Sequence, residues 1–321
     1  MATTFAVPMW QQILIQTAIS VIGAAIACWL ALVYFRRVRV ERPPIGTFNV
    51  RDIAILLTIV LLLPFLYAVL PGWAITIFLV WTFAGSLSFG YRQVVRPELL
   101  WALVGLLIGA NIYESHFMMG TVLGWQVWWI ELDLLVIAGV VAVSNLYVQG
   151  GMRLNHVVYF VLGLAVYDVF ASQVINVTAV LVAKFIGQPL DPMFGMRFQA
   201  ANYAIGIGDL LVYAVFTVAC YKAFGKAAAR IAAAVAVFFG AAAPSLFTFL
   251  VVLIDFRGDV QVPAQAFFAP AALVAYLWMR RKYGQERTMV EYLTSADNVM
   301  AVTPPAQSAP APEPEPEPVR V

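Results

Sequence analysis

Two stretches decide how this chain folds: residues 155–177, NHVVYFVLGLAVYDVFASQVINV, and residues 200–220, AANYAIGIGDLLVYAVFTVAC. Each is long and apolar enough to cross a bilayer as a helix. Each also contains one acidic residue, Asp168 in the first and Asp209 in the second. An ionisable side chain at mid-membrane depth costs roughly 2.5–3.5 kcal/mol on insertion scales, so two of them on neighbouring helices indicate a functional site.

The composition extends the membrane assignment to the whole chain. Of its 321 residues, 63% are hydrophobic and only 11% are charged, whereas a soluble globular protein carries about 25% charged residues. We therefore expect an all-α polytopic membrane protein in contact with the lipid bilayer. The net charge of +2 gives no support for nucleic-acid binding.

Nine apolar runs are long enough to cross about 30 Å of hydrocarbon: roughly 11–35, 52–70, 73–91, 97–114, 125–148, 155–181, 199–222, 229–254 and 262–280. Spans 1 to 5 form an expected N-terminal scaffold, 1–150, and spans 6 to 9 a transmembrane core, 151–285, that carries both aspartates. A cytoplasmic tail, 286–321, follows. From about residue 303 the tail alternates proline with alanine or glutamate and is predicted to be disordered.

Lysine and arginine are distributed unevenly among the connecting segments. Fifteen follow the odd-numbered spans, whereas the connections on the other side hold only Lys184, Arg197 and Arg257. Because positively charged loops remain in the cytoplasm, this pattern predicts an N-terminus outside and a C-terminus in the cytoplasm.

The two aspartates are predicted to lie at one depth. Asp168 is 13 residues from Asn155, where span 6 enters, and Asp209 is 13 residues from Lys222, where span 7 leaves. At 1.5 Å per residue both distances are about 20 Å, so antiparallel helices would bring the side chains face to face. Two carboxyl groups in contact share one proton and titrate as a unit.

Such a pair can hydrolyse a peptide bond without a metal or another cofactor. The ionised carboxylate activates a water while the protonated one hydrogen-bonds the carbonyl. Gly206 and Gly208 leave room for another backbone, and an extended substrate is the expected visitor. Spacing alone leaves alternatives open: a proton- or cation-coupled transporter that uses the same acids, or a buried polar pair without catalysis.

Three motifs in order resemble the presenilin and signal peptide peptidase family of intramembrane aspartyl proteases. They are Tyr167-Asp168 on span 6, Gly206-Ile207-Gly208-Asp209 on span 7, and a Pro-Ala motif that opens span 9. The family carries YD, GxGD and PAL in this order. The resemblance covers spans 6 to 9 and implies that Asp168 and Asp209 are the catalytic pair.

The third motif departs from the family pattern. Pro263-Ala264-Gln265 has glutamine where the family has leucine, and Pro270-Ala271-Ala272-Leu273 is a weaker alternative register. The resemblance implies that this segment shapes the active site and helps to hold the substrate backbone. The departure bears on substrate preference more than on fold.

The predicted orientation favours the signal peptide peptidase type, whose members have the N-terminus outside. This resemblance implies transmembrane peptide substrates, namely signal-peptide remnants or type II anchors, and leaves a homo-oligomer open. Glu131 and Asp133 in span 5 are two residues apart, so they point to different helix faces and are not expected to form a second pair. The two histidines, His116 and His156, are too far apart in sequence to predict a metal site.

Overall fold

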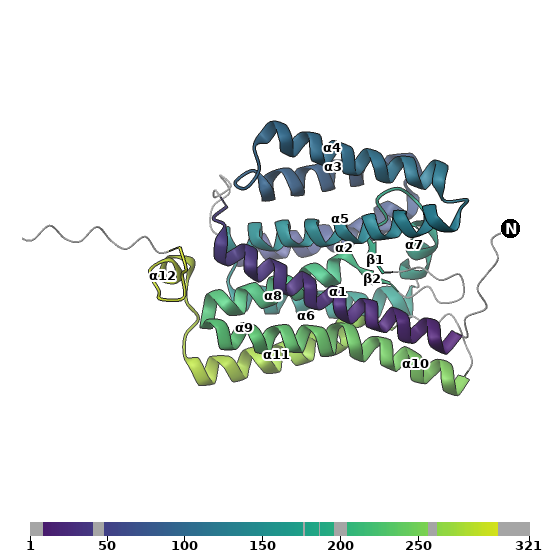
Figure 1. Ribbon diagram of the computed structural model, residues 1–321. Helices are drawn as coiled ribbons and strands as arrows, with labels where there is room; N and C mark the ends of the chain where they lie inside the picture. The colour runs from purple at the N-terminus through teal and green to yellow at the C-terminus, as the bar shows by residue number, and fades with distance from the viewer. Residues whose placement is uncertain are drawn as a thin grey trace, which may run out of the picture.

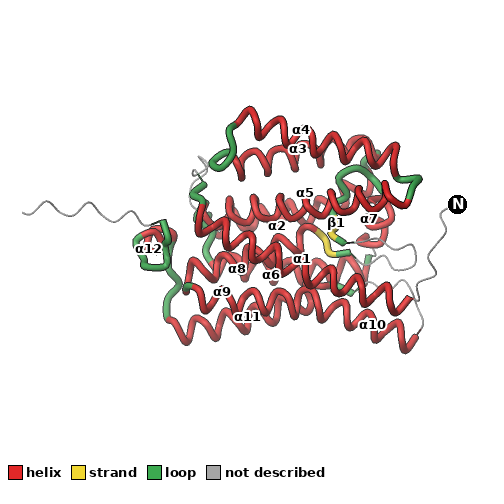
Figure 2. Tube along the Cα trace, in the orientation of Figure 1, coloured by secondary structure: helices red, strands yellow, loops and turns green. Residues whose placement is uncertain are grey.

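The computed structural model describes residues 9–40, 48–175, 177–185, 187–195, 204–255 and 262–300. These residues are almost entirely helical, with one two-stranded sheet (Figures 1 and 2). Within the described ranges, eight helices are long and apolar enough to cross a membrane. By helix length and hydropathy the chain is therefore a multi-pass membrane protein, and the predicted all-α class is confirmed.

The first four helices follow the predicted spans closely. They are α1 (Met9–Arg37), α2 (Val50–Val69), α3 (Gly72–Tyr91) and α4 (Pro97–Tyr113), which a π-helical turn, η1 (Glu114–Met118), continues. The boundary between α2 and α3 falls at Leu70 and Pro71, which are both extended. Proline fits the first position before a helix because it has no backbone N–H to leave unsatisfied.

The predicted span 155–181 is wrong at its C-terminal end. α5 (Val122–Gln149) is followed by α6 (Leu154–Val169), a π-helical turn η2 (Phe170–Val174) and then a separate short helix, α7 (Val177–Phe185). α7 docks against α2, where Lys184 Nζ donates to the carbonyls of Tyr67, Ala68 and Leu70 at 2.8, 3.0 and 2.6 Å. Carbonyls at the C-terminal end of a helix lack donors within the helix, so Lys184 satisfies those of α2 and holds α7 against it.

The predicted span 199–222 begins too early. Strand β1 (Met193–Phe194) pairs antiparallel with β2 (Ile205–Gly206), with Met193 opposite Gly206. α8 (Ile207–Phe224) starts only after this pairing, and the Ile207 N–H donates to the Pro192 carbonyl at 2.8 Å. The apolar run therefore contains a strand end and a helix, because sheet pairing holds the residues before Ile207 in an extended conformation.

One continuous helical rod follows α8. Gly225, at φ +86°, alone makes the turn between α8 and this rod. The rod consists, without a break, of α9 (Lys226–Val235), the π-helical segment η3 (Ala236–Ala242) and α10 (Ala243–Asp255). A positive φ suits glycine because it has no Cβ. The chain therefore turns at one residue between the predicted spans 199–222 and 229–254.

The last long helix, α11 (Ala264–Tyr283), contains 20 residues and is thus about 30 Å long. It matches the ninth predicted span in position and length, but only eight helices of the described chain meet both the length and the hydropathy criteria, and α11 is not among them. Gln265, Pro270 and the three basic residues of its last turn lower its hydropathy.

α8 lies at the centre of the molecule. It packs against α1, α5, α6, α9 and α11, whereas α3 and α4 form an outer layer on α5 (Figure 1). The core is made of large side chains of α8, such as Tyr213 and Phe216, and small ones of α1 and α9. Small residues let neighbouring helices approach α8 closely.

The segment after α11 folds back onto one end of the helices. In α12 (Met289–Leu293) the fully buried Tyr292 packs against Phe35 and Tyr221, and Arg287 forms an ion pair with Asp297 at 2.8 Å. Residues 286–300 of the expected tail thus lie against the helical body. Residues from 301 onward, including the stretch predicted to be disordered, lie outside the described residues.

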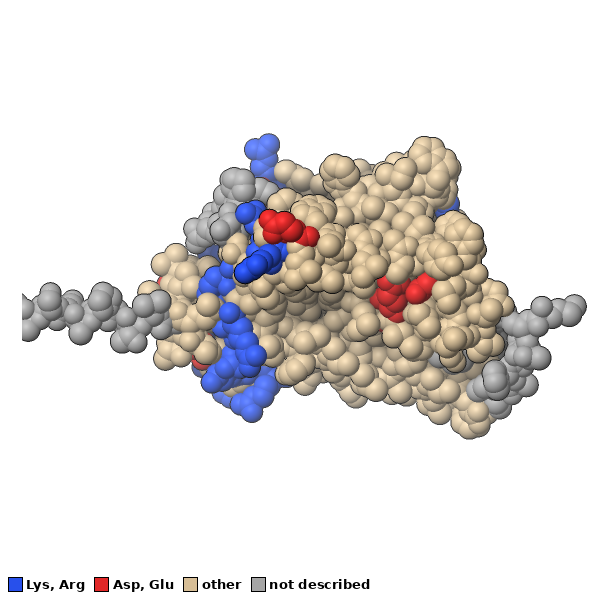
Figure 3. Space-filling model, turned by 45° about the horizontal axis from the view of Figure 1, so that its top comes forward, with Lys and Arg blue, Asp and Glu red and all other residues tan. Residues whose placement is uncertain are grey.

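Basic side chains gather at this same end. The last turns of α1, α8 and α11 are basic, and Figure 3 shows lysine and arginine concentrated beside α12, with few on the rest of the visible face. Lysine and arginine, which are unevenly distributed along the sequence, are thus also concentrated at one end of the structure.

Candidate active site

Asp168 lies where α6 changes its hydrogen-bonding pattern. It is the second-last residue of the α-helical part, directly before η2. A π-turn leaves the regular i to i−4 ladder, and such turns are frequent at functional sites. The Ser172 hydroxyl donates to the Asp168 carbonyl at 2.6 Å. The side chain of Asp168 is partly exposed, so its carboxylate is available for contacts with other helices.

Asp209 occupies the third position of α8, in its first turn. Its predicted place inside a long helix is wrong, because the helix begins at Ile207. A side chain at this position reaches back toward the residue that caps the helix. A Cβ on Gly206 would lie 3.5 Å from Asp209 Oδ2, which places that oxygen beside the backbone of Gly206. The positive end of the helix dipole favours a carboxylate there.

Gln265, the second residue of α11, joins the two aspartates. Its backbone N–H donates to Asp168 Oδ2 at 3.1 Å, and its side-chain Nε2 donates to Asp209 Oδ1 at 2.6 Å. The first N–H groups of a helix have no partner within the helix, so a carboxylate is a favourable acceptor for them. Asp168 and Asp209 precede Gln265 by 97 and 56 residues in the sequence, so three distant chain segments meet at Gln265.

The other residues of the predicted site lie next to Asp168, Asp209 or Gln265 in the sequence. Tyr167 and Ile207 are partly exposed. Pro263 caps α11 and Ala264 is its first residue, so both set the position of Gln265. A Cβ on Gly208 would meet no heavy atom within 4 Å, so the space beside this glycine is open.

Tyr213 is a residue of this region that the sequence analysis missed. It lies one helical turn after Asp209, is fully buried and packs edge-on against Phe268 of α11, with ring centroids 4.8 Å apart. Its hydroxyl donates to the Gly240 carbonyl at 2.9 Å. Pro244 has no N–H for that carbonyl four residues earlier, so the tyrosine satisfies it. Tyr213 in α8 and Gly240 in η3 are far apart in sequence, and no local pattern predicts their contact.

A second group of buried polar residues fixes the connection between α7 and β1. Asn111 Nδ2 donates to Glu131 at 3.1 Å and its Oδ1 accepts from the Leu190 N–H at 2.8 Å. Asp133 accepts from the Gly195 N–H at 2.8 Å. Glu131 and Asp133 therefore have separate partners, as their spacing predicts. Glu131 contacts the Asn111 side chain that holds Leu190 before β1, and Asp133 holds Gly195 after β1.

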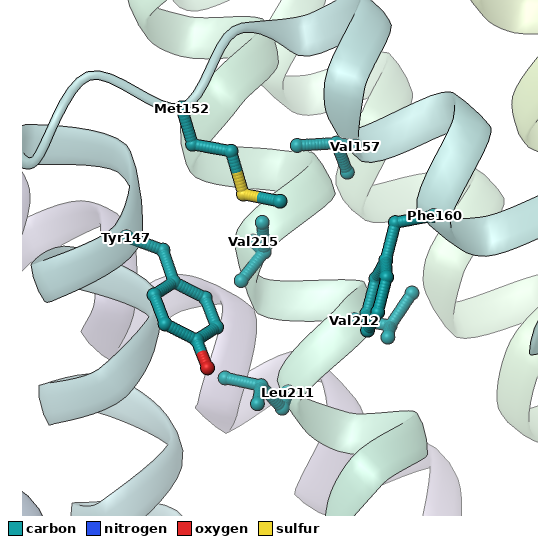
Figure 4. Close-up of a pocket in the computed structure, with 7 residues that line it drawn as sticks. All are labelled: Tyr147, Met152, Val157, Phe160, Leu211, Val212 and Val215. Atoms are coloured by element: carbon teal, nitrogen blue, oxygen red, sulfur yellow. The ribbon is translucent and has the colours of Figure 1, made fainter. Parts of the chain in front are cut away.

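An apolar pocket lies between α5, α6 and α8, away from the aspartates. Tyr147, Met152, Phe160 and Leu211 are among its lining residues, and the Tyr147 hydroxyl points toward Leu211 (Figure 4). Neither Asp168 nor Asp209 lines it. Within the described ranges, no group of three histidine, cysteine, aspartate or glutamate side chains is arranged to hold a metal ion.

No protein-family model matches this chain, and no curated protein matches it. The site is therefore interpreted from its own geometry.

Proposed function

We propose that this protein is an intramembrane aspartyl protease of the presenilin and signal peptide peptidase type, with Asp168 and Asp209 as its catalytic pair. The observation that carries the proposal is the convergence of both carboxylates on Gln265, at 3.1 and 2.6 Å. Three motifs that are far apart in sequence contribute to one site in this way. Two carboxylates that share one hydrogen-bonding neighbour can act together on one substrate.

The chemistry follows from two carboxyl groups that share one proton. The ionised member removes a proton from a water, whose oxygen attacks the peptide carbonyl carbon, while the protonated member hydrogen-bonds the carbonyl oxygen. A proton then passes to the leaving nitrogen as the C–N bond breaks. The first turns of α8 and α11 both point N–H groups toward the site, which favours the negative charge of the carboxylates.

The surroundings of Asp209 suit an extended substrate. The β1–β2 pair ends at Gly206, three residues before Asp209, and each of its strands has one edge without a third strand in the described chain. An unpaired edge offers backbone N–H and C=O groups to a peptide. The open space at Gly208 lies on the same turn as Asp209. A helical substrate would have to unwind locally to use these groups.

The proposal includes the membrane arrangement. α11 serves as a ninth span beside the eight more apolar helices. The basic end beside α12 in Figure 3 faces the cytoplasm, because positively charged ends remain there. The N-terminus of α1 is then outside. With this orientation the substrates are signal-peptide remnants and type II anchors, whose N-termini are cytoplasmic.

The test is cleavage of a labelled type II transmembrane peptide by purified protein in lipid, with products identified by mass spectrometry. Wild type, Asp168→Asn and Asp209→Asn are compared with Glu98→Gln, which changes an exposed acid at the start of α4. We expect both aspartate variants to lose at least about a thousandfold in rate, as for other catalytic groups that act as a unit. Glu98→Gln should cut like wild type.

Two further measurements identify the chemistry. A peptide isostere with a hydroxyl group in place of the scissile bond should inhibit wild type, because it imitates the attacked carbonyl. Cleavage that survives either aspartate substitution would contradict the proposal. Ion-dependent uptake into vesicles without any peptide product, abolished in the same variants, would instead identify a coupled transporter.

A further inference from the structure

The Gln265 side chain has more hydrogen-bonding capacity than its contacts with the aspartates use. Its residue is only 2% exposed, and its Nε2 is bound to Asp209 Oδ1. The other polar atom of the same group, Oε1, is buried and has no hydrogen-bond partner among the residues that the structure describes. Most buried polar atoms are paired, so an unpaired one calls for an explanation.

The position of this oxygen is fixed by the chemistry of the amide. Oε1 and Nε2 share one carbon and one plane, and Nε2 lies 2.6 Å from Asp209 Oδ1. Oε1 therefore lies beside the carboxylate pair, close to where a substrate must be cut. A neutral carbonyl oxygen accepts hydrogen bonds and cannot donate them. The group that it binds must be a donor.

A carboxamide has the same donor and acceptor as a peptide bond. The N–H side of the Gln265 carboxamide is held by Asp209, so its C=O side is left to accept a hydrogen bond. A residue at the edge of a β-sheet offers its backbone carbonyl to a neighbouring strand in the same way. The natural donor on an extended substrate is a backbone N–H next to the bond being cut. Leucine, which the family motif has at this place, offers no such acceptor.

We propose that Gln265 Oε1 accepts a hydrogen bond from a substrate backbone N–H within a few residues of the scissile bond, and that it determines specificity against residues without that N–H. The inference rests on the proposed function of the site. It assigns this enzyme a preference that depends on backbone chemistry: substrates with proline or an N-alkylated residue at the recognised position are cut slowly.

The experiment is a backbone scan of the type II substrate peptide. Single amide bonds on either side of the scissile bond, but never that bond itself, are replaced by esters, which removes one N–H at a time. The value of kcat/KM is measured for wild type and for Gln265→Met. Methionine has a similar size and keeps the backbone N–H that contacts Asp168, so the fold around α11 should be preserved.

Wild type should lose about tenfold in kcat/KM at one ester position, the size of one hydrogen bond. Gln265→Met should cut the parent peptide more slowly and show no loss at that same position. A general weakening of the fold would lower kcat/KM equally for all peptides and would not remove the response to one ester. If Gln265→Met has no turnover, the Kd of the hydroxyl isostere is compared with the Kd of its single-ester analogue for both proteins. This ratio then replaces the ratio of kcat/KM values.

The two proposals fail in different ways. If wild type cuts no peptide, the proposed function is wrong and the inference falls with it. If wild type cuts but both proteins respond equally to every ester, or neither responds, then Oε1 binds only water and the inference alone is wrong.

Discussion

α2 and α8 have nearly the same length, 20 and 18 residues, yet they occupy opposite places in the molecule. The more apolar helix is the more exposed one: 11% of the most apolar stretch of α2 is buried, against 72% for α8. Lipid surrounds the outer helices, so their surfaces must be apolar throughout. α8 is covered by protein and can carry polar groups such as Asp209, Thr217 and Lys222. In a membrane protein, hydropathy thus identifies a span, whereas its polar residues identify the centre.

The largest difference should appear when one side chain is removed from each helix. Tyr213→Ala in α8 removes a fully buried ring that contacts Phe268 and Gly240. We expect it to lower the free energy of unfolding by about 3–5 kcal/mol, as for other buried aromatic residues. Leu62→Ala in α2 removes a side chain that is 61% exposed and should stay within about 0.5 kcal/mol. Thermal unfolding in one detergent measures both.

Tyr213→Phe separates packing from hydrogen bonding in this comparison. It keeps the ring and removes only the donor to the Gly240 carbonyl, so the expected loss is about 1 kcal/mol. An equal loss for Tyr213→Phe and Tyr213→Ala would show that the ring contributes nothing, which would contradict the central position of α8.

A second comparison uses two glycines with open space around them. Gly208 in α8 and Gly105 in α4 both lack heavy atoms within 4 Å of an added Cβ. Gly208→Leu should reduce peptide cleavage by about a hundredfold, because it fills the space that the substrate needs. Gly105→Leu, on an exposed face, should leave cleavage unchanged.

Stability provides the control for the glycine pair. Replacing a helical glycine removes about 0.5–1 kcal/mol of conformational cost, so neither variant should unfold more easily than wild type. A Gly208→Leu protein that is both stable and fully active would contradict the substrate path proposed along the first turn of α8.

A smaller effect is expected at Lys184, which joins α7 to the end of the exposed helix α2. Lys184→Met removes the donor to the three carbonyls that end α2. We expect a loss of about 1–3 kcal/mol for the unsatisfied groups and faster hydrogen exchange in α7. Lys184→Arg, which keeps a hydrogen-bond donor, should retain most of the protection of α7 against hydrogen exchange. Unchanged exchange in Lys184→Met would show that α7 is held by apolar contacts alone.

The smallest effect concerns α12, outside the spans. The Thr288 N–H donates to Glu291 Oε2 at 2.6 Å, and this bond holds the pKa of the Glu291 carboxyl below its ordinary value of 4.5. A lowered pKa stabilises the folded form above the ordinary value, and this contribution is lost as the pH falls through the pKa of the folded state. Proteolysis of residues 284–300 should therefore accelerate in acid below pH 4.5 in wild type.

Glu291→Gln removes the ionisable group and is the control for this titration. Its rate of proteolysis should be higher than that of wild type at neutral pH and should change less in acid. If both proteins show the same acceleration, another group in the segment is responsible.

The sequence predicted the helices well because a span is a local property. An apolar run of 20 residues is sufficient, and the ends of α2, α3 and α4 fell within two residues of their predicted places. Interruptions of a run depend on distant partners. α8 begins at Ile207 because β1 pairs with the residues before it, and the run that starts with α6 also contains the separate helix α7, which Lys184 holds on α2. No local pattern contains either contact.

The site was predictable in its members and not in its connections. Asp168 and Asp209 were recognisable because a charge inside an apolar run is costly. Gln265 was noticed only as a departure from a motif, whereas the structure places it between both acids. Its role depends on where α11 begins relative to α6 and α8, which follows from packing over the whole core.

The π-turn after Asp168 has a consequence for the way in which this site can change. A π-turn holds one more residue than an α-turn, and each residue of an α-helix turns the chain by about 100°. Deleting one residue within Phe170–Val174 would let the turn close to α-helical geometry, so the helix on either side would keep its register while the widened turn beside Asp168 disappeared. The loss of a single codon would therefore change the backbone beside a proposed catalytic residue without any substitution at Asp168 itself.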